Sequence, residues 1–189
     1  TGAVISPFVY TDILNTNSIY APVSNERQKY GIINRLTGAE LLPPVYYKIE
    51  MTAPYSSAAY YVVQNGKRGL FLNGKLLLAA NYSQIKFLTD AYVAAKAEKG
   101  WELYSTVDGR KIFPAVYDEI YLVEMEPLFT GVPEPPPCVL AMEKDDAVTF
   151  TDMVTMKELP QSNINGQAYL KRQEPYRVYN DDNAQWGLY

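Results

Sequence analysis

The sequence predicts an all-β fold built from repeats of short antiparallel strands. Two series of residues recur at intervals of 36, 36 and 35 positions. One series consists of turn glycines and the other of tyrosines: Gly2, Gly38, Gly74 and Gly109, and Tyr10, Tyr46, Tyr82 and Tyr117. Periods in this range are typical of solenoids, propellers and arrays. Helical patterning is weak, and hairpin signals separate short runs of aromatic and β-branched residues.

The repeat is clearest from Trp101 onward. Residues 101–104 alternate large apolar and other side chains, as a half-buried strand does. Asp108-Gly109 predicts a tight hairpin turn, because glycine accepts positive φ without steric cost. Residues 111–113 resume a strand, and Pro114 interrupts its hydrogen bonding before residues 117–120 extend again.

The same pattern can be followed along the rest of the chain. Earlier strands are predicted at residues 30–33, 40–49, 60–64, 69–72, 75–85 and 92–97, with turns at Thr37-Gly38, Asn65-Gly66, Asn73-Gly74 and Lys99-Gly100. Residues 91–99 have helical propensity, yet the repeat requires a strand there. Later strands are predicted at residues 138–142, 148–150, 169–172 and 176–179, with turns at Asp145-Asp146 and at 181–183. Residues 154–165 form a degenerate copy that keeps Leu159-Pro160.

A proline-rich insertion at about residues 123–137 breaks this rhythm. Prolines cannot donate regularly to a sheet, so the insertion predicts an exposed, extended loop. Four of its prolines are candidates for docking a protein partner: Pro133, Pro135, Pro136 and Pro137. The alternative is a bulky surface connection without a ligand.

Several short motifs resemble a known family. Gln185-Trp186-Gly187-Leu188, Gly100-Trp101 with Gly109, and Lys67-Arg68-Gly69-Leu70 with Gly74 are similar to the repeats of the WG-repeat (KWG) family of bacterial proteins. Tyr30 and Arg68 stand where that family has tryptophan, and Glu102 replaces the glycine after Trp101. The resemblance implies a repeat scaffold, implies no catalytic residues, and favours a periplasmic or cell-surface location.

The two ends of the chain suggest how the repeats are arranged. The chain starts with the second half of a repeat and ends with the first half of one, so joining its ends completes a fifth repeat. We therefore expect one WG-repeat-like domain over residues 1–189, with about five repeats of 36–38 residues. The sequence leaves open a closed five-bladed β-propeller, which would protect its sheet edges, and an open β-repeat array.

Composition excludes several classes of function. The net charge of −4 offers no basic face for nucleic acid. No apolar run reaches the length of a membrane-spanning helix. Histidine is absent and Cys138 is the only cysteine, so an intrachain disulfide and a cysteine-based zinc cluster are excluded. No cofactor is predicted.

Each candidate site has an ordinary structural alternative. Trp101 and Trp186 could stack on a ligand, but their equivalent repeat positions favour packing between repeats, and the same holds for the four tyrosines. Asp145-Asp146 and Asp181-Asp182 could bind Ca²⁺, yet aspartate is common in turns. Asp118 and Glu119 could form an acid/base pair, but adjacent side chains on a strand point to opposite faces.

These observations predict a non-catalytic protein-interaction or scaffold module. A carbohydrate-binding module is the alternative, and it would need an exposed aromatic residue beside a carboxylate or amide at the same register in each repeat. A carboxylate-based hydrolase ranks third, because no convergent pair of acids is evident.

Overall fold

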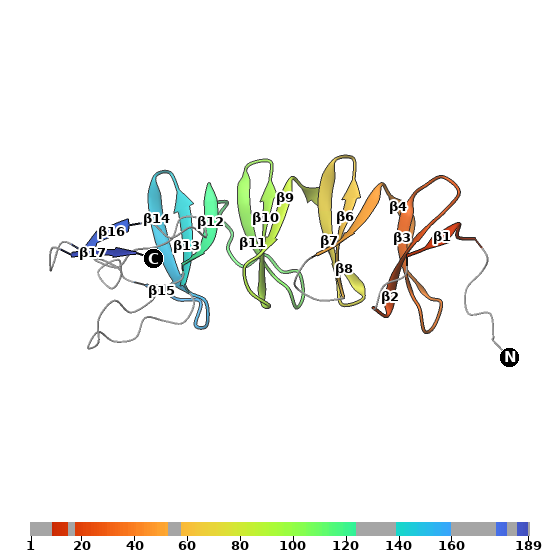
Figure 1. The fold of residues 1–189 in the computed structure, drawn as a ribbon. Coiled ribbons are helices and arrows are strands. Elements are labelled where there is room, and N and C mark those ends of the chain that lie inside the picture. Colours follow the sequence, from red (N-terminus) through yellow and green to blue (C-terminus); the bar gives the residue numbers. More distant parts are fainter. Residues whose placement is uncertain are drawn as a thin grey trace. The chain divides into compact units, whose positions relative to one another are not determined.

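The computed structural model describes residues 9–14, 18–52, 58–123, 139–159, 177–180 and 185–188 (Figure 1). The chain divides into two compact units. The N-terminal unit comprises Thr1–Lys99 and Leu103–Ile112, and the C-terminal unit comprises Gly100–Glu102 and Phe113–Tyr189.

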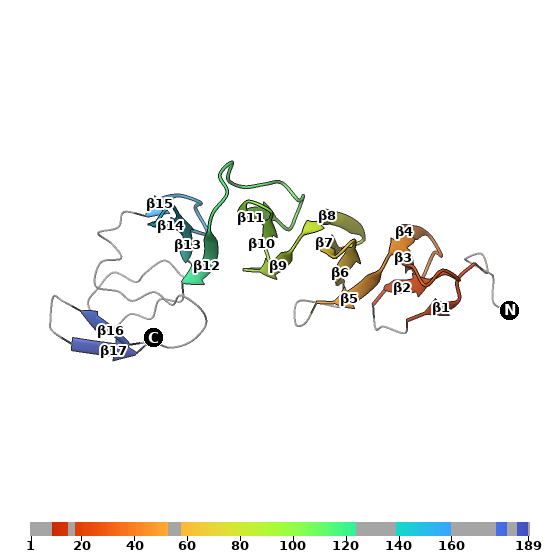
Figure 2. The same ribbon diagram turned by 90° about the horizontal axis from the view of Figure 1, so that it is seen from above.

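The described residues form antiparallel sheets of short strands and contain no helix, which confirms the all-β prediction. The strands are β1 Asp12–Ile13, β2 Tyr20–Ser24, β3 Tyr30–Asn34, β4 Glu40–Tyr46, β5 Lys48–Met51, β6 Ala59–Gln64, β7 Lys67–Leu72, β8 Lys75–Tyr82, β9 Gln84–Phe87, β10 Tyr92–Ala97, β11 Gly100–Ser105, β12 Glu119–Val123, β13 Val139–Lys144, β14 Ala147–Asp152, β15 Glu158–Leu159, β16 Arg177–Asn180 and β17 Gln185–Leu188. The sheet orders are β1-β2-β3-β4, β5-β6-β7-β8, β11-β10-β9, β12-β13-β14-β15 and β16-β17. Figure 2 shows β5 to β8 following one another across one sheet. No helix among the described residues is long and apolar enough to cross a membrane.

Tight turns join neighbouring strands where the sequence predicts them. Both residues of Asn65-Gly66 have positive φ, at 51° and 73°, and so do both residues of Asn73-Gly74, at 49° and 86°. Asp145 and Asp146 adopt the same conformation, at 50° and 64°. Positive φ at both central residues defines the type I′ turn, whose twist matches that of the flanking strands. These three predicted hairpin turns are confirmed.

Two predictions around the third sheet are wrong. The turn predicted at Lys99-Gly100 is formed by Glu98-Lys99, because β10 ends at Ala97 and β11 begins at Gly100. The strand predicted at residues 111–113 is absent, and Lys111 forms only an isolated bridge to Tyr104. Residues 91–99, in contrast, contain β10, as the repeat requires.

A four-residue turn recurs at one register in three sheets. The residue just before the turn donates a hydrogen bond from its backbone N–H to the carbonyl of the residue just after the turn, five positions later. The three bonds join Asn34 to Ala39 at 2.8 Å, Ser105 to Arg110 at 2.9 Å, and Asp152 to Lys157 at 2.9 Å. The residue before each acceptor has positive φ: Gly38 at 73°, Gly109 at 76° and Met156 at 55°. We number the repeats by their sheets, β1–β4, β5–β8, β9–β11 and β12–β15. Met156 is the counterpart of the turn glycines in the fourth repeat, and the glycine series alone does not reveal it.

Two glycines allow the fourth strand of a sheet to cross closely over the third. A Cβ at Gly69 would lie 2.6 Å from the carbonyl oxygen of Leu78, and one at Gly31 would lie 2.5 Å from that of Leu42. The ladder register shifts at both places. Glu102 and Thr149 hold the equivalent positions of the next two repeats, where a side chain cannot accept this approach. Fourth-strand pairing is accordingly reduced to isolated bridges in the third repeat, and to the two residues of β15 among the described residues of the fourth.

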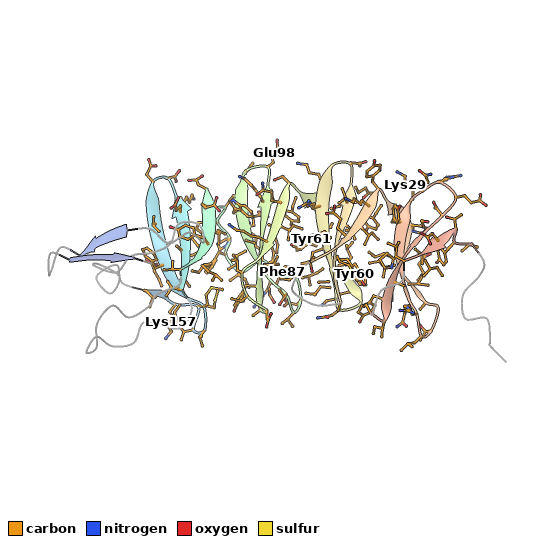
Figure 3. All side chains as sticks on the ribbon, in the orientation of Figure 1. Lys29, Tyr60, Tyr61, Phe87, Glu98 and Lys157 are labelled. Atoms are coloured by element: carbon orange, nitrogen blue, oxygen red, sulfur yellow. The ribbon has the colours of Figure 1, made fainter. Side chains whose placement is uncertain are left out.

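The core of the N-terminal unit repeats as well. One cluster gathers Ile32, Leu42, Tyr46, Ile49, Tyr60, Val62 and Phe71. Another gathers Ala59, Leu70, Leu72, Leu78, Ile85, Val93, Ala95 and Tyr104, with Tyr82 packed against it. Tyr60 and Tyr61 are neighbours on β6 that serve different clusters, because successive side chains on a strand point to opposite faces (Figure 3).

Candidate functional site

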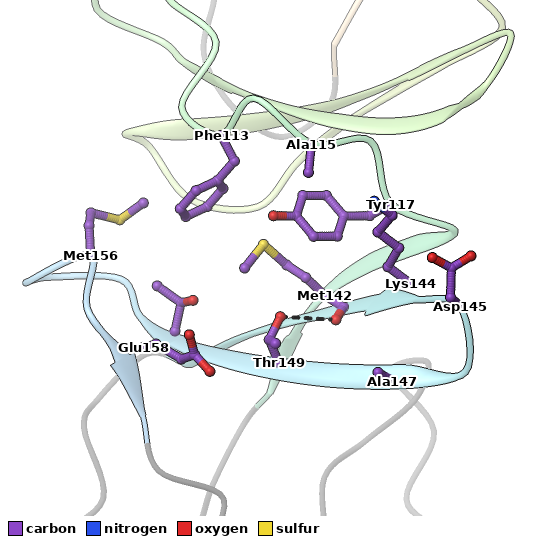
Figure 4. A pocket seen from close by; sticks show the side chains of 11 residues that line it. Phe113, Ala115, Tyr117, Met142, Lys144, Asp145, Ala147, Thr149, Met156 and Glu158 are labelled. Atoms are coloured by element: carbon purple, nitrogen blue, oxygen red, sulfur yellow. Dashed lines mark hydrogen bonds between the residues drawn. The ribbon is translucent and has the colours of Figure 1, made fainter.

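The C-terminal unit contains a pocket of about 650 Å³ (Figure 4). It is formed by the segment before β12, by β13 and β14, and by the turn that leads into β15. Its lining residues are Phe113, Ala115, Tyr117, Met142, Lys144, Asp145, Ala147, Thr149, Thr151, Met156 and Glu158. This volume lies within the range of about 300–1,000 Å³ that is usual for ligand sites.

Burial separates the pocket into a floor and a rim. Met142 and Thr151 are only 4% and 3% exposed, so they form the floor. The charged residues Lys144, Asp145 and Glu158 are exposed and lie at the rim. A ligand group that enters the pocket therefore passes charged side chains and reaches a surface of methyl, thioether and hydroxyl groups.

Two aromatic rings form one wall. Phe113 and Tyr117 pack edge to face, with ring centroids 6.3 Å apart and planes at 81°. The backbone of Tyr117 is fixed to Trp101, which accepts a hydrogen bond of 2.9 Å from the Tyr117 N–H and donates one of 2.7 Å to the Tyr117 carbonyl. Burial raises the pKa of the Tyr117 hydroxyl, and the Glu158 carboxylate raises it further. The hydroxyl is therefore protonated at neutral pH and can donate or accept a hydrogen bond.

Thr151 occupies a repeat position that is aromatic in the two preceding repeats. Four residues share this position, each paired with the residue two places after a turn residue of positive φ. They are Ile33 with Glu40 after Gly38, Phe71 with Leu76 after Gly74, Tyr104 with Lys111 after Gly109, and Thr151 with Glu158 after Met156. A threonine is much smaller than either ring. The pocket thus opens where two earlier repeats place an aromatic side chain and the first repeat places the buried Ile33.

The opposite wall is held by β13 and the hairpin that follows it. Thr149 donates a hydrogen bond of 3.3 Å from Oγ1 to the carbonyl of Met142, which ties β14 to β13 under the pocket (Figure 4). Asp118 Oδ2 accepts a hydrogen bond of 3.0 Å from the backbone N–H of Asp145. This contact gives Asp118 a structural role in holding the turn at the rim.

The predicted acidic sites do not converge. Glu119 lies on β12 opposite Glu143, whereas Asp118 turns toward Asp145. Among the described residues, no three Asp, Glu, His or Cys side chains gather in a group that could hold a metal ion. The Asp181-Asp182 pair lies outside the described residues.

The predicted repeat positions are distributed over the sheets. Tyr46 and Trp101 are buried, at 6% and 3% exposure, and the Tyr82 hydroxyl donates to that of Tyr104 at 2.8 Å. Tyr10 packs partly against the cluster of Ala21, Val23 and Ile33. Of the four tyrosines, only Tyr117 lines the pocket. Gly2, Pro133, Pro135, Pro136 and Pro137 lie outside the described residues, while Trp186 and Gly187 lie on β17 opposite Tyr179 and Val178.

Sequence reasoning missed the floor of the pocket. The available signal was a departure from the repeat at Thr151, which stands where the two preceding repeats have an aromatic residue. Met142 holds the repeat position of the core residue Val62, because it stands opposite Thr149 as Val62 stands opposite Gly69. A search for recurring residues passes over such positions.

Comparison with known proteins gives no family. No family model and no curated protein matches the chain. Among solved structures, the chain is similar to one described as a eukaryotic initiation factor (13% identity, TM-score 0.40), to the WD40 β-propeller domain of Doa1 (7%, 0.32) and to BBS1N in complex with ARL6DN (13%, 0.33). These matches cover 94%, 95% and 89% of this chain but only 48%, 60% and 56% of the other chains. The chain thus spans about half the length of the structures it matches.

Proposed function

We propose that this chain is a non-catalytic protein-interaction module, and that the pocket of the C-terminal unit receives a side chain from a partner polypeptide. The single observation behind the proposal is the pocket itself, with its buried floor of Met142 and Thr151 and its aromatic wall. Protein interfaces typically bind through a few anchor side chains that fill such pockets, surrounded by a polar rim. Lys144, Asp145 and Glu158 supply that rim.

A carbohydrate-binding module is less well supported by the same geometry. A repeat lectin would present an exposed aromatic ring at the same register in each repeat. Tyr46 is instead buried, and the Tyr82 hydroxyl is bonded to Tyr104 within a core cluster. The arrangement therefore favours one binding pocket over a series of sugar sites.

Selection from a displayed library of random peptides tests the proposed function. Captured peptides are then measured by fluorescence polarisation against the full chain and against Ala147→Arg, which places a long side chain over the exposed rim. Val107→Arg is the matched control, because Val107 is 76% exposed in the other unit. We expect peptides whose binding is lost in Ala147→Arg and kept in Val107→Arg. Failure to capture any peptide, or equal binding by both variants, contradicts the proposal.

The wider architecture is also a proposal. We propose that the described sheets belong to five WG-like repeats that close into a ring, supported by the shared period of the glycines and tyrosines. A compact chain of 189 residues has a radius of gyration of about 16 Å. Small-angle X-ray scattering that gives a value near this supports the ring, whereas a clearly larger value supports the open array.

A further inference from the structure

We infer that the pocket binds a tyrosine side chain, whose phenol ring takes the place of the aromatic residue that Thr151 lacks. The inference rests on the proposed function, since it names the side chain that the partner inserts. It is carried by the internal repeat, because the two repeats that directly precede Thr151 fill this position with an aromatic ring, and the first repeat fills it with Ile33.

The second and third repeats supply the aromatic templates. Phe71 is fully buried, and its ring meets that of Tyr20 edge to face at 5.5 Å and 79°. Tyr104 is 8% exposed and meets the ring of Tyr82 edge to face at 5.8 Å and 71°. In both repeats the position belongs to an aromatic ring that completes a core cluster.

The surface that would receive the ring beside Thr151 is retained. Tyr117 holds the register of Tyr82 and Tyr46, because the three tyrosines pair with Trp101, Arg68 and Tyr30 at one repeat position. The wall of the site is thus present, and the floor holds Thr151 in place of a ring. A partner can supply the missing ring from outside.

The chemistry of the walls favours a phenol. In the template, the hydroxyl of Tyr82 donates to the hydroxyl of Tyr104 at 2.8 Å, so a bound phenol can form the same bond with Tyr117. Met142 and Met156 supply flexible thioethers, which adapt to a ring and contact it favourably. The volume of about 650 Å³ also leaves space for the backbone that carries the side chain.

The position of the charges disfavours a cationic side chain. Asp145 and Glu158 are exposed at the rim beside Lys144, and Met142 and Thr151 form the buried floor. An ammonium or guanidinium group that reached this floor would lose water, while the carboxylates of Asp145 and Glu158 stay exposed to solvent at the rim. A neutral ring loses little by the same transfer.

Titration of the full chain with p-cresol, the side chain of tyrosine, tests the inference. The methyl signals of Met142 and Met156 in NMR spectra report on the pocket directly. We expect saturable shifts of both signals in the wild type and in Thr151→Val, which removes the hydroxyl but leaves the space. Thr151→Phe, which restores the ring, should weaken binding at least about tenfold, equivalent to ~1.4 kcal/mol. Ala147→Arg should also weaken it, and it leaves the floor unchanged.

Other outcomes overturn the inference. The inference fails if p-cresol produces no saturable shift, or if n-butylammonium binds more tightly than p-cresol. It also fails if Thr151→Phe and Ala147→Arg both bind p-cresol like the wild type. Peptides that bind through the pocket without an aromatic residue would also overturn it, yet leave the proposed function standing. Saturable p-cresol binding with no captured peptide would support the inference and contradict the proposed function.

Discussion

Replacing Gly69 with alanine tests the close crossing of β8 over β7 in the second sheet. The new Cβ would lie 2.6 Å from Leu78 O, 2.8 Å from Ala79 C and 2.8 Å from Ala80 N. All three atoms belong to the backbone, so β8 must move as a whole. Movement of β8 would expose Leu78, which is 4% exposed in the wild type, and burial of a leucine contributes about 1.5–3 kcal/mol. With a lost ladder hydrogen bond of about 1 kcal/mol, the expected loss in free energy of unfolding is about 3 kcal/mol.

Gly66→Ala provides the matched control for this substitution. No atom lies within 4 Å of a Cβ at Gly66, but its φ of 73° strains any other residue, at a cost of about 1–2 kcal/mol. The midpoint of urea unfolding should therefore fall for both variants and fall further for Gly69→Ala. If Gly69→Ala unfolds at the same midpoint as Gly66→Ala or above it, the argument from close crossing is refuted.

Three further predictions concern the aromatic positions. Thr151→Phe should gain about 1 kcal/mol, because filling the pocket buries a ring, and the melting temperature should rise by about 2–4 °C, while Thr151→Val should show no such rise. Tyr82→Phe removes the hydrogen bond to Tyr104 and should lose about 1 kcal/mol in urea unfolding, whereas Tyr47→Phe, at a side chain 68% exposed, should unfold like the wild type. Burial raises the pKa of Tyr46 above its usual 10.0, so its contribution to stability is complete below that pH and is lost as the pH rises through the folded-state pKa. The free energy of unfolding, measured in urea, should then fall less for Tyr46→Phe than for the wild type between about pH 9 and pH 11. An equal fall with pH in both proteins would contradict this.

The turns at Asn65-Gly66 and Asn73-Gly74 were predictable because each depends on residues that adjoin in sequence. Asn65-Gly66 and Asn73-Gly74 carry positive φ at both positions, and few residue pairs other than these accept it. Met156 adopts the same kind of conformation without that signature, at a φ of 55°. Its turn is supported by Asp152, whose Oδ1 accepts from the N–H of Val154 at 2.7 Å and from that of Thr155 at 3.1 Å. A capping aspartate was therefore the available signal where glycine is missing.

The fate of the fourth strand could not be predicted from local pattern. Residues 111–113 read as a strand, yet only Lys111 forms a bridge, because the strand that must be crossed carries Glu102 where earlier sheets carry glycine. That constraint acts between segments about ten residues apart. A pattern read along one strand carries no information about the side chain that lies beneath it.

The pocket follows from the same kind of departure, and this links the fold to the proposed function. Recurring residues such as Tyr46 and Tyr82 are used in packing, so they are the least available to a ligand. Thr151 breaks the recurrence at a position whose neighbours are still arranged to hold a ring, and it does so beside exposed charges. In a repeat scaffold, a binding site can arise when one repeat gives up a core side chain while the adjoining surface is kept. The positions to examine for function are thus those where a repeat loses a core side chain, and Thr151 is such a position in the C-terminal unit.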